Sequence, residues 1–242
     1  MPRLERPPLR EALGTPEGKH RYVRRLFSVI ADRYDLITVL LSWGQDRSWK
    51  RRLVAMAPIH ATTRALDLAC GTGDLTYLCA RRGALVVGLD ITARMVDIAR
   101  SKRSPRDRAS WVVGDMVALP FGDAQFDLVT TGYGIRNVPA IDVAVAEIGR
   151  VLRPGGQFLS LDFDRPSNAA VRAAYLAYLT VIGSALGIVL HRDPDTYRYI
   201  PESISRYPGA DAVAHLIRSS GFAACETYPV LGGLMAFHCA WK

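Results

Sequence analysis

The stretch ALDLACGTGDL, residues 65–75, combines an apolar run with a Gly-Thr-Gly turn that has an acidic residue on either side. An apolar run that leads through a glycine-rich turn into a helical pattern is typical of the first strand and helix of an open parallel sheet. Glycine lets the backbone of such a turn approach a ligand closely. The stretch therefore predicts an α/β fold with a ligand site at this turn.

Apolar runs alternate with helical patterns after this unit, which is typical of a parallel sheet with crossover helices. The expected strands are 64–69, 84–90, 110–115, 126–132 and 157–163, and the expected helices are 74–82, 92–102, 140–152 and 209–220. The last two runs, ACETYPVL and LMAFHCAW, are separated by Gly232 and Gly233. A glycine pair between two such runs predicts an antiparallel terminal hairpin.

The length of 242 residues and the apolar content of 49% are those of one folded domain. We expect residues 1–20 to form a flexible basic tail without the apolar run of a secretory signal. Residues 21–242 form the domain, in which 21–60 are a helical cover over one end of the sheet and 168–208 are an insertion that acts as a substrate lid. The four cysteines lack metal-ligand spacing, so no metal site is expected.

The Gly-Thr-Gly turn differs from the known phosphate-binding turns. It lacks the third glycine of the dinucleotide fingerprint, and no Gly-Lys-Ser/Thr follows it. The carboxylate of Asp67, four residues before Gly71, would repel a pyrophosphate at close range. A cationic ligand suits the turn better, and S-adenosylmethionine carries both an ammonium and a sulfonium group.

Polar residues at the ends of the next strands fit the rest of that ligand. Asp90 ends the second strand, where a carboxylate accepts hydrogen bonds from ribose hydroxyls. Asp115 and Met116 end the third strand, next to an adenine ring, and Gly132 ends the fourth, beside the methyl group. Taken singly, each acidic residue could be a turn or cap residue. Their convergence at one edge of a parallel sheet favours a ligand site.

The motifs LDLACGTGDLT, GLDIT, GDMVALPF, FDLV and RVLRPGG together resemble class I methyltransferases that use S-adenosylmethionine. More specific are FSVIADRYD, LLSWGQDRSWKR, YGIRNV and YRYIPESISRYP. With these motifs the chain resembles the C-methyltransferases of ubiquinone and menaquinone biosynthesis over about residues 24–242. The resemblance implies a Rossmann-like sheet of seven mostly parallel strands whose last strand is antiparallel.

The resemblance also implies which residues contact the cofactor. Together with the residues of the glycine turn, these give the full set of predicted cofactor-binding residues: Asp67, Gly71, Thr72, Gly73, Asp90, Ile91, Asp115, Met116 and Gly132. Two of them depart from the pattern of the family. Gly132 stands where some members have serine, which removes one side-chain hydrogen bond. Asp115 stands where members of the ubiquinone branch often have asparagine, and both side chains accept hydrogen bonds.

The implied reaction is C-methylation of a prenylated quinol ring, with demethylmenaquinol as the favoured acceptor. Arg136 would stabilise the developing phenolate, directly or through a water, Asn137 would hold the hydroxyl oxygen, and Tyr34 would contact the ring. The alternatives are a surface ion pair for Arg136 and core packing for Tyr34. His191 and Asp193 are candidate bases, although a solvated loop is the better prediction for both.

Residues 173–190 form an 18-residue run without a charge, which is long enough to be considered as a membrane span. We reject a span, because it would separate the terminal hairpin from the sheet that the hairpin should join. Two alternatives stay open: a core helix, or an apolar lid that leans on a membrane surface. In the second, the basic residues of 21–25 and 47–52 would meet anionic lipids, and the protein would be peripheral on the inner face of the plasma membrane instead of free in the cytoplasm.

Rival functions share parts of this pattern. A methyltransferase for another small aromatic molecule would have the same cofactor site. An RNA or DNA methyltransferase would explain the net charge of +8. Enzymes that methylate base amino groups usually carry Asp/Asn-Pro-Pro-aromatic after the fourth strand, whereas this chain has GYGIRN. A nicotinamide-binding domain is disfavoured, because the carboxylate of Asp67 would repel the pyrophosphate of the dinucleotide. We therefore expect no nucleic acid partner, and the sequence leaves a homodimer open.

Overall fold

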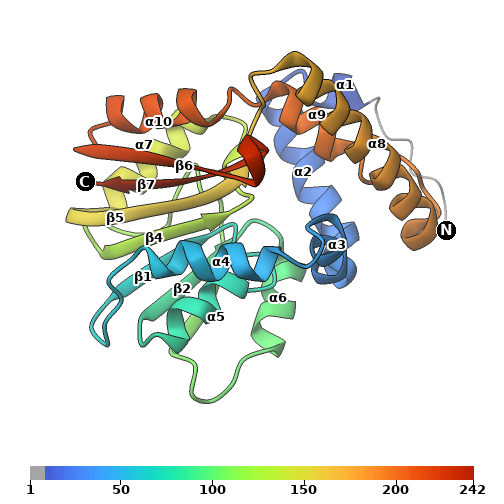
Figure 1. Cartoon of the computed structure of the whole chain (residues 1–242). Helices are drawn as coiled ribbons and strands as arrows, with labels where there is room; N and C mark the ends of the chain where they lie inside the picture. The colour runs from blue at the N-terminus through green and yellow to red at the C-terminus, as the bar shows by residue number, and fades with distance from the viewer. Residues whose placement is uncertain (1–8) are drawn as a thin grey trace.

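Seven strands of the computed structural model, which describes residues 9–242, form one twisted sheet in the order β3-β2-β1-β4-β5-β7-β6 (Figure 1). The strands are β1 (Arg64–Leu68), β2 (Leu85–Asp90), β3 (Ala109–Val113), β4 (Phe126–Gly132), β5 (Leu152–Phe163), β6 (Ala224–Val230) and β7 (Met235–Trp241). Strand β1 pairs in parallel with β2 and β4, whereas β7 runs antiparallel to β5 and β6. The predicted sheet and terminal hairpin are confirmed.

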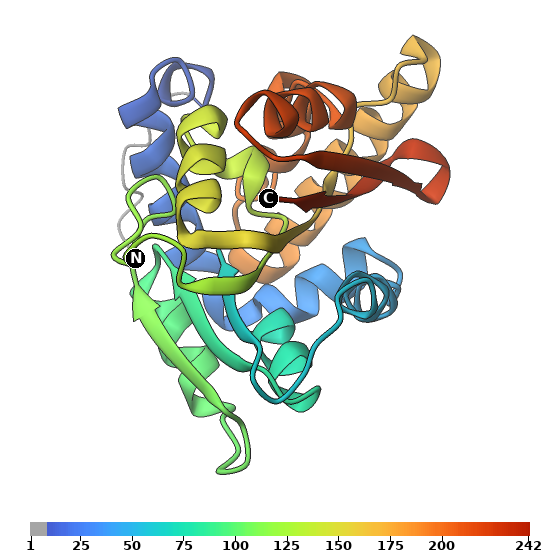
Figure 2. The same cartoon turned by 90° about the vertical axis from the view of Figure 1, so that its left-hand side faces the viewer.

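Helices cover both faces of the sheet (Figure 2). One face carries α4 (Asp46–Ala55), α5 (Asp74–Arg81) and α6 (Ala93–Ser101), and the other carries α7 (Ile141–Val151) and α10 (Ala210–Ser219). Successive side chains of a strand point to opposite faces. In β1, Ala65 packs with α4, α5 and α6, whereas Leu66 and Leu68 pack with α7 and α10. Asp67 therefore points toward the face of α5.

Strand β5 is longer than the sequence predicts. The residues Arg-Pro-Gly-Gly end α7 as expected, but the strand begins at Leu152 instead of residue 157. Leu152 pairs with Phe126, and the register of β4 and β5 shifts before the next pair. Gly155, at a positive φ of 77°, donates its N–H to the carbonyl of Lys242 over 2.8 Å. The irregular segment is stabilised by this non-local contact, which a local pattern does not reveal.

A separate group of helices lies beyond the carboxyl ends of the parallel strands, on the right of Figure 1. It consists of α1 (Leu9–Ala12), α2 (Pro16–Ile30), α3 (Tyr34–Leu41), α8 (Ala169–His191) and α9 (Tyr199–Arg206). Apolar side chains of these helices form a core cluster of their own. We call this group the cover. It unites two segments that are far apart in the sequence.

The predicted flexible tail is wrong for residues 9–20, while residues 1–8 lie outside the described part of the chain. Helix α2 begins inside that tail, at Pro16. The side chain of Thr15 accepts a hydrogen bond from the N–H of Gly18 over 3.1 Å and so caps the helix. Proline at the first helical position is a helix-start signal. Thr15-Pro16 therefore marks the start of the cover.

Helix α4 lies outside the cover that was expected to include residues 21–60, because it packs on a face of the sheet. Lys50 in this helix is buried and forms ion pairs with Asp46 over 2.7 Å and with Asp74 over 2.8 Å. Burial lowers the pKa of Lys50, but the two carboxylates outweigh that effect and raise the pKa above its usual value. Lys50 is therefore withdrawn from the predicted contact with lipid.

Helix α8 contradicts the core-helix alternative for residues 173–190. Its buried residues are Leu179, Gly183 and Gly187, and most of its other side chains reach the surface. Within residues 9–242 it is the one helix that is long and apolar enough to cross a membrane by length and composition. The chain nevertheless returns from α8 to the same sheet, where β7 pairs with β5. The lid role predicted for residues 168–208 stays a prediction.

Candidate active site

A cavity lies under the cover at the carboxyl ends of β1, β2 and β4. Its empty volume is about 670 Å³, counting the open mouth. We call it the first cavity. Six of the predicted cofactor-binding residues line it: Gly71, Asp90, Ile91, Asp115, Met116 and Gly132. Ligand sites of open α/β sheets lie at this edge.

The glycine turn is held against the end of β2. Gly71 and Gly73 have positive φ angles of 54° and 93°, which L side chains rarely adopt. The N–H of Gly71 donates to Oδ2 of Asp90 over 2.9 Å, and the N–H of Thr92 donates to Oδ1 over 2.8 Å. Burial raises the pKa of Asp90, and these two N–H groups oppose the rise. Each carboxylate oxygen keeps a free lone pair at the cavity wall.

Asp115 is shared between its own loop and the cover. Its Oδ1 accepts the N–H of Val117 over 3.1 Å, and its Oδ2 lies 2.8 Å from Nε2 of His20 in α2. His20 lines the first cavity, and the sequence interpretation missed it because residues 1–20 were expected to be a tail. The contact places a helix of the cover across one end of the first cavity.

Three predicted cofactor residues, Asp67, Thr72 and Gly73, do not line the first cavity, so their contact with the cofactor stays a prediction. Asp67 is fully buried and accepts hydrogen bonds from the hydroxyls of Thr76 over 2.6 Å and Thr130 over 2.9 Å. Thr72 donates its hydroxyl to Asp35 of α3 over 2.5 Å. An added Cβ on Gly73 would lie 2.9 Å from the ring of Tyr77. Asp67 and Thr72 thus tie this part of the chain to its neighbours, and Gly73 leaves room for the ring of Tyr77.

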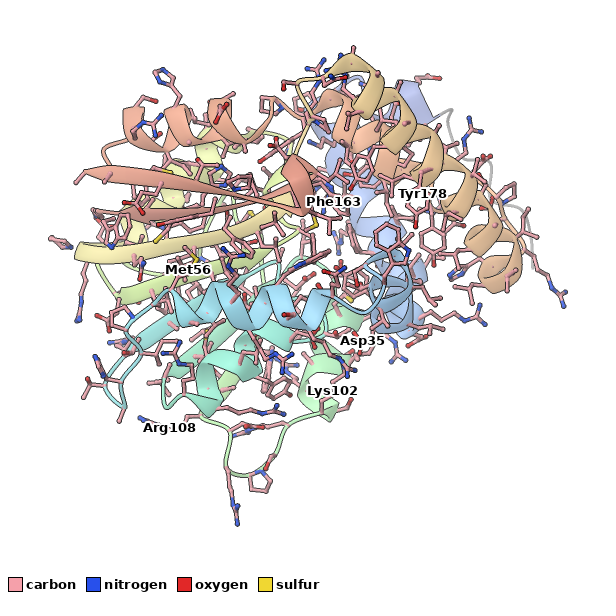
Figure 3. All side chains as sticks on the ribbon, viewed as in Figure 1. Asp35, Met56, Lys102, Arg108, Phe163 and Tyr178 are labelled. Carbon is pink, nitrogen blue, oxygen red and sulfur yellow. The ribbon has the colours of Figure 1, made fainter. Side chains whose placement is uncertain are left out.

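Asp35 ties the turn to two helices. Besides Thr72, it contacts Nζ of Lys102 over 2.5 Å, just after α6 (Figure 3). The turn is thus clamped between the cover and the sheet. The clamp explains why Thr72 faces away from the first cavity, since its hydroxyl is engaged by a carboxylate.

The carboxyl of Asp67 gives a testable pH dependence. Burial raises its pKa from 3.8 to about 6, although the two threonine hydroxyls oppose the rise. Between these pH values the folded chain holds a proton that the unfolded chain has lost, so this group stabilises the fold below pH 3.8 and its contribution falls as the pH rises to 6. An Asp67→Asn variant does not titrate. Its unfolding free energy relative to the native chain is expected to rise by about 3 kcal/mol across this interval.

Denaturant unfolding of both proteins at several pH values measures this difference. An Asp97→Asn variant is the matched control, because Asp97 is an exposed residue of α6. A difference that stays flat between pH 4 and pH 6 would contradict the raised pKa of Asp67.

A second cavity lies between the cover and the sheet, and its empty volume is about 700 Å³ when the space open to solvent is counted. It is mostly apolar and shares Phe27, Tyr34 and Tyr133 with the first cavity. Tyr34 is half-buried and lies edge-on to Phe27, with ring centres 6.0 Å apart. Burial raises the pKa of Tyr34. Tyr34 thus lies on the wall that separates the two cavities, and its contact with the ring stays a prediction.

Arg136 lies at the wall of the second cavity and forms a buried ion pair instead of the alternative surface pair. Its Nη1 is 3.4 Å from Oδ1 of Asp162, and its backbone N–H donates to Oδ2 over 3.1 Å. The guanidinium lies 4.7 Å from the ring centre of Phe163 (Figure 3). Its Nε is buried and has no hydrogen-bond partner within residues 9–242. One donor of Arg136 is thus available to a ligand.

Asn137 lines the first cavity, and its amide is fixed from two sides. Its Nδ2 donates to the carbonyl of Tyr133 over 2.7 Å, and its Oδ1 accepts the hydroxyl of Tyr199 over 2.9 Å. Tyr133 has a positive φ of 61°, and its hydroxyl donates to Asp46 over 2.7 Å. A positive φ on a bulky residue is a strained conformation that surrounding contacts must stabilise.

The sequence interpretation missed Asp162 and Tyr199. Asp162 lies near the carboxyl end of β5, so the same strand-end rule that indicated Asp90 would have found it. Tyr199 lies within a quoted motif whose residues were given no role. His191 and Asp193 line neither of the two cavities, and Nε2 of His191 lies 2.8 Å from the hydroxyl of Tyr197.

Comparisons with known proteins agree with this geometry. The model of the "ubiE/COQ5 methyltransferase family" matches residues 16–242. A relative from Dinoroseobacter shibae named ubiquinone/menaquinone biosynthesis C-methyltransferase UbiE is 37% identical over 93% of this chain and 92% of its own. A relative of the same name from Zymomonas mobilis is 36% identical over 94% and 95%.

Solved structures show the same fold. A SAM-dependent methyltransferase from Thermotoga maritima, described as a possible histamine N-methyltransferase, has a TM-score of 0.63 at 18% identity over 90% of this chain and 99% of its own. A SAM-dependent methyltransferase from Aquifex aeolicus has a TM-score of 0.57 at 14% identity over 81% and 89%. The chain therefore belongs to the ubiE/COQ5 methyltransferase family and is an S-adenosylmethionine-dependent methyltransferase.

Proposed function

We propose that this enzyme methylates a ring carbon of a prenylated quinol, with demethylmenaquinol as its acceptor and menaquinol as its product. The observation that carries the proposal is the meeting of the two cavities at Tyr34 and Tyr133, with the guanidinium of Arg136 at the wall of the second. The relatives from Dinoroseobacter shibae and Zymomonas mobilis carry the names of quinone-pathway C-methyltransferases, which supports this class of acceptor.

The residues of the first cavity fit S-adenosylmethionine. Asp90 offers a free lone pair on each carboxylate oxygen, which suits the two hydroxyls of a ribose. The buried thioether of Met116 lies on the wall near Asp115, where it can cover an aromatic base. Gly71 and Gly132 leave backbone instead of side chains at the wall between them. Bound there, S-adenosylmethionine supplies an electrophilic methyl group.

Transfer to carbon requires an electron-rich ring. A quinol gains electron density at the ring carbon when its hydroxyl proton leaves to solvent. The ring carbon then bonds to the methyl carbon while the methyl–sulfur bond breaks, and the same ring carbon finally releases its proton to solvent. Positioning of the ring and stabilisation of the phenolate are therefore the main tasks of the protein.

Arg136 suits the second task. Its charge is permanent, and its pairing with Asp162 keeps the buried pair neutral overall. The unpartnered Nε can donate a charge-assisted hydrogen bond to a phenolate oxygen. Asn137, held by Tyr133 and Tyr199, would fix the hydroxyl oxygen beside the first cavity. Tyr34 would pack on the ring.

Methyl transfer to two quinols side by side tests the proposal. The purified enzyme with methyl-labelled S-adenosylmethionine is expected to label reduced demethylmenaquinone in preference to the prenylated benzoquinol precursor. Oxidised demethylmenaquinone is the control, because it has no hydroxyl to ionise and should stay unlabelled. Label in the benzoquinol alone would correct the ring, and label in neither quinol would contradict the proposal.

A further inference from the structure

The cover presents an apolar surface made by two segments. Helix α8 exposes Val181 to 66% and Val189 to 77%, and Trp43, two residues after the end of α3, is exposed to 62%. The ring of Trp43 lies against the ring of Tyr178, which is marked in Figure 3, with ring centres 5.6 Å apart. This contact joins α8 to the end of the α3 segment. We call this the α3–α8 surface. Its exposed large apolar residues are Leu36, Leu40, Trp43, Val171, Val181, Ile188 and Val189.

The composition of α8 is unusual for a surface helix. A surface helix of a globular protein normally turns charged side chains to solvent. The run 173–190 contains no charged residue, and its solvent-facing residues 174, 177, 181, 185 and 188 recur at helical spacing. A single exposed valine needs no explanation, but a continuous apolar stripe indicates an interaction surface.

Basic side chains border this surface. Arg165 and Arg192 lie beyond the two ends of α8, Arg33 directly precedes α3, and Arg47 follows Trp43 by four residues. All four are exposed, and none forms an ion pair with a residue of 9–242. Each is therefore free to meet an anion.

Acidic residues near the same segments are engaged, three of them in ion pairs and Asp193, beside Arg192, in hydrogen bonds from Asp195 and Thr196. Asp32 pairs with Arg94 over 2.5 Å, and Asp195 pairs with Arg198 over 2.9 Å. Asp35 is engaged by Thr72 and Lys102. The border of the apolar stripe is thus cationic in effect.

We propose that the α3–α8 surface docks on an anionic lipid bilayer, with α8 lying in the plane of the interface. An apolar stripe bordered by arginines, with a tryptophan and a tyrosine at its edge, matches the layers of a bilayer surface. Each arginine near anionic headgroups adds to the attraction. A second copy of this chain fits the surface less well. A two-fold contact would place the same arginines of two molecules, each of charge +8, close together, where they repel.

Vesicle flotation without any quinol tests this docking independently of the proposed reaction. The native enzyme is expected to bind vesicles with about one third phosphatidylglycerol at least about tenfold more tightly than pure phosphatidylcholine at low salt, and high salt should weaken this binding. Val189→Glu and Val181→Glu should each reduce binding about tenfold or more. Val143→Glu is the matched control, because Val143 is an exposed valine of α7 outside the surface.

Tryptophan fluorescence and the molecular mass in solution separate docking on lipid from formation of a dimer. Docking should shift the emission of the native enzyme to the blue, and Trp43→Phe should abolish the shift, since Trp49 and Trp111 are buried and Trp241 lies at the far end of the sheet, beside Gln157. S-adenosylmethionine binding should be the same in every variant, which reports their folding. Failure of the native enzyme to bind anionic vesicles at low salt would overturn the proposal. So would a dimer in solution that Val189→Glu dissociates.

Discussion

Replacing Arg136 with lysine is expected to lower kcat about 10²- to 10³-fold while the affinity for S-adenosylmethionine changes little. Lysine keeps the positive charge that pairs with Asp162, so no buried carboxylate is left alone. It removes the planar guanidinium and with it the Nε that has no partner within residues 9–242. Steady-state kinetics with a reduced quinol, together with calorimetry of cofactor binding, measure the two effects.

The role of Arg136 at the phenolate can be separated from a purely structural role. With acceptors of increasing hydroxyl acidity, the rate of Arg136→Lys should approach that of the native enzyme, because an acidic quinol ionises with less help. Arg153→Lys is the matched control, because Arg153 is an exposed residue that pairs with Asp127. Undiminished kcat in Arg136→Lys, or an equal loss for every acceptor, would contradict the assignment.

Replacing Asp90 with asparagine is expected to raise the Kd for S-adenosylmethionine about 10²-fold. The carboxylate accepts from Gly71 and Thr92 and has one further acceptor position on each oxygen. Asparagine keeps one oxygen and replaces the other by a donor, so one ribose hydroxyl loses its partner and the other loses a charged acceptor. Isothermal calorimetry of the two proteins measures the change.

A cofactor analogue without the ribose 2′-hydroxyl shows whether Asp90 contacts the ribose or only stabilises the glycine turn. If Asp90 contacts the ribose, this analogue should bind the native enzyme more weakly than S-adenosylmethionine, and the difference should shrink in Asp90→Asn. Thermal unfolding reports damage to the turn, and Asp97→Asn on exposed α6 is the control. An undiminished difference in Asp90→Asn would show that Asp90 acts through the turn alone.

The sequence predicted much of the sheet because its strands are short apolar runs bounded by turns. The run 126–132 coincides with β4, and the predicted helix 74–82 differs from α5 by one residue. The strand-end rule placed Asp90, Asp115 and Gly132 on one cavity, because parallel strands bring their carboxyl ends to one edge. These are local patterns combined with one rule of topology.

Tertiary contacts decide what the sequence did not predict. Asp67 lies in the predicted strand, but its direction depends on which face of β1 packs on α5. His20 reaches Asp115 across 95 positions of the chain, and no local pattern indicates that contact. An uncharged run such as residues 173–190 is compatible with a core and with a surface, so the sequence alone does not decide the exposure of α8. Only the packing of its neighbours separates them.

The shared wall at Phe27, Tyr34 and Tyr133 limits how this enzyme can be redesigned. A substitution there alters the shape of both cavities at once, so a change made to admit a new acceptor also alters the seat of the methyl donor. Ile37, Leu41 and Ile200 line the second cavity without lining the first. Acceptor preference can therefore diverge, in nature or in the laboratory, through these three positions while the methyl donor keeps its site.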